Sequence, residues 1–392
     1  LANAIERRAW AMAHKGVAKG RPPMVLPVQK TTEPVFSCPA DGSDCFTWIE
    51  AHKREAQVLL QQNQVLLARY AAAANAPYFS NPFRNDLTAP TPPYPWLFRA
   101  HALLLAQAAL QWQQSQQEQA LSTLRQAATL RHRIATHANS LVEPMVALAL
   151  QYRELRWLSS AIARAGVAGN HQPQLAQLVM SPMPSLQQGL EGEKQSMARE
   201  FDALRMGSAF DETRPSSQAK TLWSNGLIAT LSDLTFLPNN PLNRMVQTMD
   251  ELAAISATPL PGLPKAYATY QDRFKTNSCF DLSAVRNYTG KCLSVIAMPN
   301  DHTTYVLSIA DVEAYRRLVL LQQQAQAQRI TAANMPAWLI QSPPALRNPY
   351  TLEPMQWDAD TNSLVFEGKE RQSQNPDQSS TYRAQLRLPV QP

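Results

Sequence analysis

One stretch of the chain, residues 140–164, carries an uninterrupted helical pattern. Its apolar positions step by three and four residues throughout, which is the spacing of one face of an α-helix. The stripe consists of Leu141, Met145, Leu148, Tyr152, Leu155, Ser159 and Ile162. Asn139 or Ser140 can cap its N-terminus, and Gly166 and Gly169 can end it. Because a long helix is stabilised mainly by packing of its apolar face, this segment predicts a helical body around it.

Further helices of this body are predicted, and three of them, at 45–75, 96–112 and 185–205, show stripes with the same spacing. The further predicted helices lie at 45–75, 96–112, 116–137, 185–205, 217–231, 241–256 and 308–330. Glycines are few, at 12, and many of the 30 prolines stand between these segments, which suits helices joined by rigid connections. The polar run QWQQSQQEQ predicts a corner between two helices or a solvated helix face. Ser308 with Asp311 resembles a capping box, which predicts that the last long helix starts there.

The end of the chain changes from a helical to a strand pattern. MQWD and SLVFEGK are joined by ADTN, a hairpin signal, and residues 382–388 alternate between two faces. We therefore predict a mainly α fold, an antiparallel helical bundle or short α-solenoid, with a small C-terminal antiparallel β-hairpin or sheet. The predicted domains are an irregular Pro-rich arm at 1–44, a helical bundle at 45–205, a loop-rich helical region at 206–345 and a small β tail at 346–392.

The four cysteines form two pairs that are close in sequence, Cys38 with Cys45 and Cys279 with Cys292. Their spacing is too long, and their surroundings too poor in histidine, for a zinc site, so no metal is expected. Disulfides are favoured over free buried cysteines, and the local pairing is one of three connectivities. Disulfides indicate an oxidising compartment, which predicts a periplasmic location.

Several classes of function and location can be set aside. No segment is long and apolar enough to cross a bilayer. The chain begins at Leu1 rather than methionine, so we expect a missing N-terminal anchor or signal, which would tether the protein to the inner membrane. The net charge of +6 is scattered, so nucleic acid is not an expected partner. Gly-x-Ser-x-Gly and Gly-x-Gly-x-x-Gly are absent, and Val285 stands where a phosphate loop needs its first glycine, so no cofactor is expected.

Two stretches resemble segments of an uncharacterised group of proteobacterial envelope proteins that pair an N-terminal anchor with a helical body. They are NSLVEPMVALALQYRELRWLSSAIA and NYTGKCLSVIAMPNDHTTYVLSIADVEAYRRLVLLQQQ. The tail LRNPYTLEPMQWDADTNSLVFEGK is similar to a short module of such proteins, Asp/Asn-Pro-aromatic-x-Gly-x-Pro followed by an aromatic strand, and loosely to the C-terminal region of pseudopilins. The matching residues are Asn348, Pro349, Tyr350, Pro354 and Trp357, whereas Leu352 and Glu353 replace the usual small turn residues. The resemblance implies an envelope location and brings no catalytic residue.

One carboxylate falls on an apolar stripe. In the segment 185–205 this stripe is formed by Leu186, Leu190, Met197, Phe201 and Leu204, and Glu193 lies on the same face. An ionised carboxylate on an apolar face costs several kcal/mol unless it is paired. We expect Arg156 as its partner. The pair either fixes the register of two helices or serves as a general acid or ligand-anchoring site.

Aromatic residues gather in the Pro-rich connection between the first two predicted helices. The candidates for a binding surface among them are Tyr78, Phe79, Phe83, Tyr94 and Trp96. They either fold over the helices or form a partner-binding surface, because Tyr and Trp on rigid loops make good anchors.

These features favour a non-enzymatic periplasmic or envelope binding or scaffold protein. It would be a subunit of a membrane-associated complex, with envelope or secretion-system proteins as partners. The alternative is an envelope-modifying hydrolase, acting on peptidoglycan or lipid, with Glu193 as acid or base. A deep cleft at Glu193 would favour the enzyme, and a broad apolar surface would favour the scaffold.

Overall fold

The computed structural model of the protein describes residues 45–77, 92, 94–165, 171–205, 239–275, 302–370 and 380–385. The described residues are mostly helical and end in a small three-stranded antiparallel sheet, so the predicted fold class is confirmed. The predicted arm at 1–44 and the predicted helix at 217–231 lie outside the described residues.

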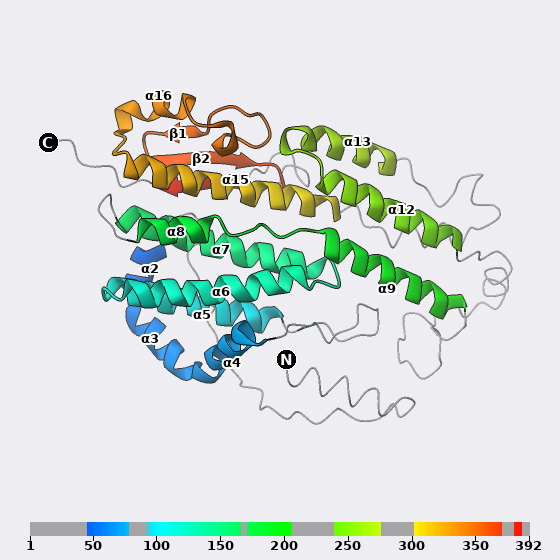
Figure 1. The fold of residues 1–392 in the computed structure, drawn as a ribbon, viewed down its shortest axis with the longest axis horizontal. Helices are drawn as coiled ribbons and strands as arrows, with labels where there is room; N and C mark the ends of the chain where they lie inside the picture. The colour runs from blue at the N-terminus through cyan, green and yellow to red at the C-terminus, as the bar shows by residue number, and fades with distance from the viewer. Residues whose placement is uncertain are drawn as a thin grey trace.

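The N-terminal half supplies eight helices among the described residues. They are α2 (Cys45–Ala51), α3 (Lys53–Gln62), α4 (Gln64–Asn75), α5 (Tyr94–Gln113), α6 (Gln117–Thr136), α7 (Val142–Ala165), α8 (Gln172–Val179) and α9 (Gln187–Arg205). Helices α4, α5, α6 and α7 pack against one another (Figure 1). The predicted corner between α5 and α6 is confirmed: Ser115 adopts φ 61° and the Gln116 N–H donates to Gln111 O over 2.9 Å.

The C-terminal half contributes α-helices, short 3-10 helices and three strands among the described residues. They are α12 (Asn239–Ser256), η2 (Leu260–Gly262), α13 (Leu263–Lys275), α15 (His302–Ala327), η4 (Ala332–Asn334), α16 (Met335–Ile340), η5 (Pro344–Leu346), β1 (Gln356–Asp358), β2 (Ser363–Gly368) and β3 (Ser380–Gln385). Helix α15 lies between the N-terminal helices and the sheet, with α7 and α8 on one side and β2 and β3 on the other (Figure 1).

The main core is continuous from Cys45 in α2 to Ala384 in β3. Trp157 of α7 lies at its centre, fully buried, where its Nε1–H donates to the Leu105 carbonyl over 3.0 Å. Helices α7 and α15 are joined by a buried polar pair, because the Ser159 hydroxyl donates to Gln322 Oε1 and Gln322 Nε2 donates back to Ser159 O. This core contains residues from both sides of positions 205 and 345, and the predicted domain division stays a prediction.

The stripe predicted on residues 140–164 faces this core. Four of its members, Leu141, Leu148, Leu155 and Ile162, are at most 3% exposed. The opposite side of α7 is covered as well, since Val146, Ala147 and Leu150 pack in a second cluster against α4, α5 and α6. Helix α7 is thus the central helix of the N-terminal half.

The predicted start of the last long helix is wrong. Helix α15 begins at His302, so Ser308 and Asp311 lie within it rather than at its N-terminus. The Ser308 hydroxyl donates to the Thr304 carbonyl one turn earlier. Asp311 is fully buried and accepts hydrogen bonds from the Tyr350 hydroxyl, at 2.6 Å, and from the backbone N–H groups of Lys369 and Glu370.

The tail folds as the strand pattern predicts. Strand β2 pairs with both β1 and β3 in antiparallel register, and Phe366 lies opposite Tyr382. Gly368 is required next to Asp311, because a Cβ there would lie 2.5 Å from Asp311 Oδ2. The buried Asp311 carboxylate of α15 therefore attaches the tail that carries the sheet through its hydrogen bonds.

Candidate functional site

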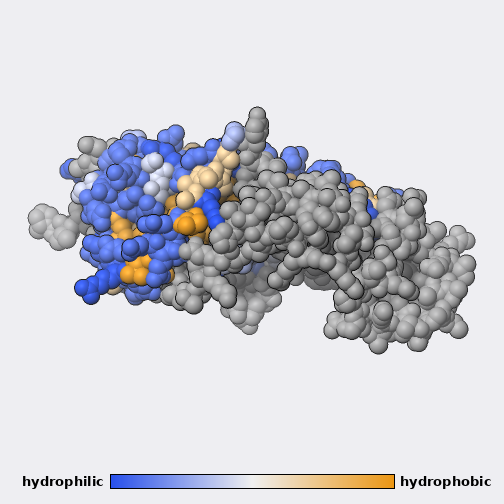
Figure 2. Space-filling model, turned by 90° about the horizontal axis from the view of Figure 1, so that it is seen from below, coloured by the Kyte–Doolittle hydropathy of each residue, from blue (hydrophilic) through white to orange (hydrophobic). Residues whose placement is uncertain are grey.

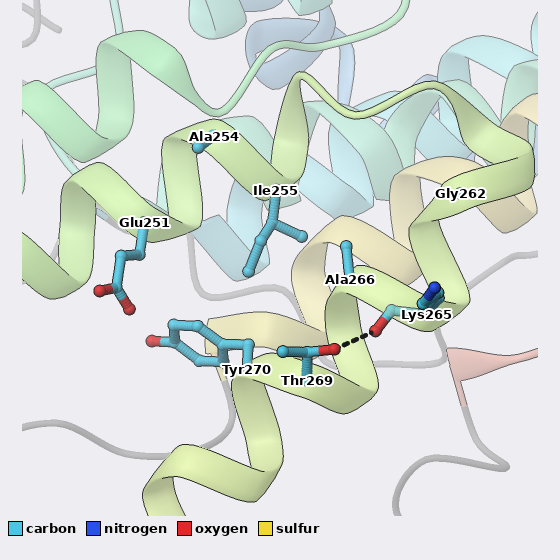
Figure 3. Close-up of a pocket in the computed structure, with 8 residues that line it drawn as sticks. All are labelled: Glu251, Ala254, Ile255, Gly262, Lys265, Ala266, Thr269 and Tyr270. Atoms are coloured by element: carbon cyan, nitrogen blue, oxygen red, sulfur yellow. Dashed lines mark hydrogen bonds between the residues drawn. The ribbon is translucent and has the colours of Figure 1, made fainter.

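A hollow opens between the last turns of α12 and the first half of α13. It is open to solvent and has a volume of about 420 Å³, which lies within the range of small-molecule pockets. Its lining residues, drawn in Figure 3, are Glu251, Ala254, Ile255, Gly262, Lys265, Ala266, Thr269 and Tyr270. Helix α13 lies along α12 at one end of the molecule, so the hollow belongs to a peripheral helical hairpin (Figure 1).

The floor of the hollow is apolar. Ile255 and Tyr270 are 9% and 8% exposed, and Figure 3 shows Ile255 pointing between the two helices toward Ala266. In the connection between the two helices, a Cβ at Gly262 would lie 3.3 Å from Thr258 Cγ2. An apolar group that enters the hollow would therefore replace water over aliphatic and aromatic carbon.

Charged groups lie at opposite sides of this floor, Glu251 on α12 and Lys265 on α13 (Figure 3). The Thr269 hydroxyl is turned to its own helix and donates to the Lys265 carbonyl over 2.9 Å. Burial, and next the negative charge of Glu251, raise the pKa of Tyr270 above its ordinary value. Tyr270 therefore stays protonated and offers a neutral ring, not a phenolate, to a bound group.

The hairpin is fixed to the helical body through α12. Met249 and Leu252 are buried in the main core at 1% exposure each. On the outside, the Lys194 ammonium of α9 pairs with Asp250 of α12. The hollow is thus carried by a helix whose inner face is held in place before any partner binds.

The structure places Glu193 at the N-terminus of α7 rather than in a cleft. Its Oε1 accepts a hydrogen bond from the Leu141 backbone N–H over 2.9 Å. This approach is close: a Cβ at Gly189 would lie 2.6 Å from Ser140 O, and Gly192 likewise lies against Asn139. Arg156 lies fifteen residues further along, about 22 Å in an α-helix, so the two predicted partners do not meet.

A second carboxylate completes the same helix end. Glu143 Oε2 accepts from the Ser140 backbone N–H at 2.9 Å and from the Ser140 hydroxyl, and its Oε1 accepts from the Tyr94 hydroxyl at 2.9 Å. Ser140 is thus the cap that the sequence predicts, in a capping-box arrangement. Two carboxylates at the positive end of a helix stabilise it. Both Glu143 and Glu193 therefore hydrogen-bond to the N-terminus of α7.

A buried polar chain crosses the N-terminal helices. The Tyr70 hydroxyl of α4 lies 3.0 Å from His101 Nδ1 of α5, and His101 Nε2 lies 3.8 Å from Glu154 Oε1 of α7. Glu154 Oε2 accepts from Arg131 Nε of α6 over 2.9 Å, and Arg131 also donates to the Pro182 carbonyl. None of the four side chains was singled out by the sequence analysis.

Burial shifts the pKa values of two side chains in this buried polar cluster, His101 and Glu154. It lowers the pKa of His101 to about 3, and the positive charges of Arg153 and Arg131 act in the same direction, against a hydrogen bond with the Leu150 carbonyl. It also raises the pKa of Glu154, against the opposing effect of Arg131. His101 is therefore neutral at neutral pH.

The predicted aromatic surface is only partly described. Tyr94 and Trp96 lie in the first turn of α5, both half-buried, and the Trp96 ring lies under the Arg99 guanidinium at 5.0 Å. Tyr78, Phe79 and Phe83 lie outside the described residues. Tyr94 binds Glu143, so it anchors α5 to α7 and does not face outward as a free anchor.

The predicted cysteine pairs are likewise not tested. Cys45 opens α2 and is 1% exposed, whereas Cys38, Cys279 and Cys292 lie outside the described residues. Disulfides therefore stay a prediction.

Figure 2 shows the underside of the molecule, where apolar residues over α3 and α4 form separate patches among hydrophilic ones. Val58 of α3 and Val65 of α4 are exposed at 51% and 52%, which is ordinary for isolated surface residues. Within the described ranges, no group of His, Cys, Asp and Glu is placed to hold a metal ion. Nor is any helix in those ranges long and apolar enough to cross a bilayer.

Comparison with known proteins adds no relative: no family model matches the chain, and no match is found among the curated proteins or the solved structures.

The helix predicted at 241–256 is confirmed as α12, whereas the second helix of the hairpin, α13, was missed. Its signal was present, because Leu263, Tyr267 and Tyr270 step by four and three and are all buried in α13. Pro264 obscured it, although proline is well tolerated in the first turn of a helix.

Proposed function

We propose that this chain is a non-enzymatic binding or scaffold protein of the cell envelope. Its partner, an envelope or secretion-system protein, inserts an apolar side chain into the hollow between α12 and α13. The observation that carries this proposal is the hollow itself, with an apolar floor and with charges only at its sides.

The shape of the hollow favours a macromolecular partner over a small molecule. Pockets for small ligands enclose most of the ligand surface. Here the walls come from two neighbouring helices, and four of the lining residues are exposed, namely Ala254, Gly262, Lys265 and Thr269. A single anchor side chain in an apolar pocket, surrounded by polar contacts, is the usual arrangement of a protein-binding hot spot.

The envelope location rests on the cysteines and on the resemblance to envelope proteins. A disulfide between Cys38 and Cys45 would tie the arm at 1–44 to the first turn of α2. The proposal places the protein in the periplasm, as a subunit of a membrane-associated complex.

The alternative, an envelope-modifying hydrolase with Glu193 as acid or base, requires this carboxylate to face a substrate cleft. Glu193 instead accepts the Leu141 N–H, and it is not among the residues that line the hollow. No described feature therefore favours this alternative.

The proposal is tested by filling the hollow. Ala266→Trp places an indole into it, whereas Ala268→Trp places the same side chain on the exposed face of the same helix. Partners of the wild-type protein are first identified by cross-linking in envelope preparations, and their recovery with both variants is then quantified. We expect Ala266→Trp to reduce recovery of the specific partner at least tenfold, and Ala268→Trp to leave it unchanged.

Equal recovery with both tryptophan variants would contradict the proposal. Circular dichroism and thermal unfolding of the purified variants confirm that both are folded. Turnover of peptidoglycan or lipid by the wild type, lost in Glu193→Gln with the fold retained, would instead support the hydrolase.

A further inference from the structure

The lining of the hollow follows helix α13 along its axis. Lys265 and Ala266 belong to one turn, and Thr269 and Tyr270 belong to the next. Gly262 precedes them by about one further turn. Residues four apart in an α-helix are separated by about 6 Å along its axis. The hollow is therefore elongated between the two helices (Figure 3), and a partner segment that fills it runs in the direction of α13.

Apart from their ends, the walls of the hollow offer side chains and not backbone groups to a partner. Both walls are α-helices, in which the backbone N–H and C=O groups pair within the helix. An extended segment laid over Ile255 and Tyr270 would leave its own backbone groups unpaired against carbon, which is costly. A helix pairs its backbone internally and presents only side chains. Ala254 and Ala266 are small, so a helix can approach these walls closely.

The charge on the α13 wall favours an acidic neighbour. Lys265 is exposed and forms no ion pair with another described residue. It lies in the first turn of α13, where the helix dipole also attracts negative charge. On the opposite wall, Glu251 accepts a hydrogen bond from Gln247 of its own helix. A partner carboxylate beside Lys265 would therefore find both a cationic side chain and the positive end of a helix.

We infer that the partner binds through an amphipathic helix, which lies along α12 and α13 as a third helix. Its apolar anchor covers Ile255 and Tyr270, and an Asp or Glu on the flank of the same helix faces Lys265. This inference rests on the proposed partner site and adds the conformation and charge of the segment that fills it. Recognition of this kind uses side chains on successive turns of the bound helix.

Two cross-links test the conformation of the bound segment. A photo-cross-linking residue is placed at Gly262 or at Thr269, about 10 Å apart along the same wall, and the partner residues in the adducts are identified by mass spectrometry. We expect the two partner residues to lie about seven positions apart, because a helix rises about 1.5 Å per residue. A spacing of about three positions indicates an extended segment and would overturn the inference. Adducts between two copies of this chain would also overturn it.

Charge reversal tests the acidic flank. We expect Lys265→Glu to reduce recovery of the partner at least threefold and Lys265→Arg to retain it. Lys53→Glu, at an exposed lysine of α3, is the matched control and should leave recovery unchanged. Added salt should narrow the difference between Lys265→Glu and the wild type. Equal recovery with Lys265→Glu and the wild type would contradict the inferred charge of the partner helix.

The inference and the proposed function can fail separately. Reduced recovery with Ala266→Trp, together with adducts about three positions apart, would retain the hollow as the partner site and overturn the helix. Equal recovery with Ala266→Trp and the wild type, with no adduct from Gly262 or Thr269, would overturn the proposed function and this inference with it. Circular dichroism confirms that each variant is folded.

Discussion

The interior between α4 and α7 and the hairpin of α12 and α13 place their charges in opposite ways. In the interior, Arg131 and Glu154 are paired with side-chain exposures of 2% and 7%. On the hairpin, Glu251 and Lys265 flank an open apolar floor, and Lys194 holds Asp250 at the surface. Charges that are buried and hydrogen-bonded help to specify the fold, whereas charges on an exposed rim contribute little to stability.

The largest expected effect comes from breaking the interior pair. Glu154→Ala leaves the Arg131 guanidinium buried without its carboxylate, and loss of one partner of a buried pair costs about 3–5 kcal/mol. Denaturant unfolding of the purified variant measures this loss. A loss of unfolding free energy below about 1 kcal/mol would mean that Arg131 reaches solvent. It would contradict the contrast between a buried interior pair and exposed charges on the hairpin.

The second largest effect is expected from acid, which should lower the free energy of unfolding through the buried His101. The unfolded chain protonates His101 below pH 6.5, whereas the folded chain does so only near pH 3, so stability falls as the pH drops between these values. The expected loss is about 1.5 kcal/mol from pH 6.5 to pH 5, reduced to the extent that Glu154, whose pKa is raised, takes up a proton.

Unfolding free energies measured at several pH values check this slope. His101→Gln should remove it, and His137→Gln, at an exposed histidine, should retain it. Identical slopes in all three proteins would assign the acid sensitivity to other groups.

The ion pair that attaches the hairpin at the surface should contribute much less to stability. Lys194→Ala removes an ion pair whose Asp250 side chain is 58% exposed, and such pairs contribute below about 1 kcal/mol. The same denaturant series detects this change, and added salt should diminish it. A loss comparable to that of Glu154→Ala would contradict the contrast between the two regions.

The smallest expected effect on stability is at the turn before the sheet, and there a substitution should stabilise the protein rather than destabilise it. Leu352 adopts φ 61°, a left-handed conformation that costs a non-glycine residue roughly 1–2 kcal/mol. Leu352 is 45% exposed. Leu352→Gly should therefore stabilise the protein by about 0.5 kcal/mol, after the entropic cost of glycine. A lower melting temperature would show that the leucine side chain contributes packing instead.

Local patterns predicted the elements whose periodicity agrees with their environment. The stripe of α7 was visible because its members face one core, and the strands of the tail were visible because they alternate. Helix α13 was missed because it is short and begins beside Pro264. Asp311 was misassigned because a Ser-x-x-Asp spacing looks the same at a helix start and inside a helix.

Contacts between segments that are distant in the sequence could not be predicted from local sequence patterns. Glu193 was recognised as a carboxylate that needs a partner, but its partner is the Leu141 backbone N–H, reached because Gly189 and Gly192 allow α9 to approach. Tyr70, His101, Glu154 and Arg131 lie on four helices and become neighbours only when these pack. No periodicity within one helix encodes such a cluster.

The most direct test of the partner site places a photo-cross-linking residue at Thr269, on the rim of the hollow, and for comparison at Ala268 and at Val58. Irradiation of cells that produce each variant is followed by identification of the cross-linked protein. We predict one specific adduct from Thr269 and none from the other two positions. Adducts from Val58 without any from Thr269 would contradict the assignment of the α12–α13 hollow as the binding site.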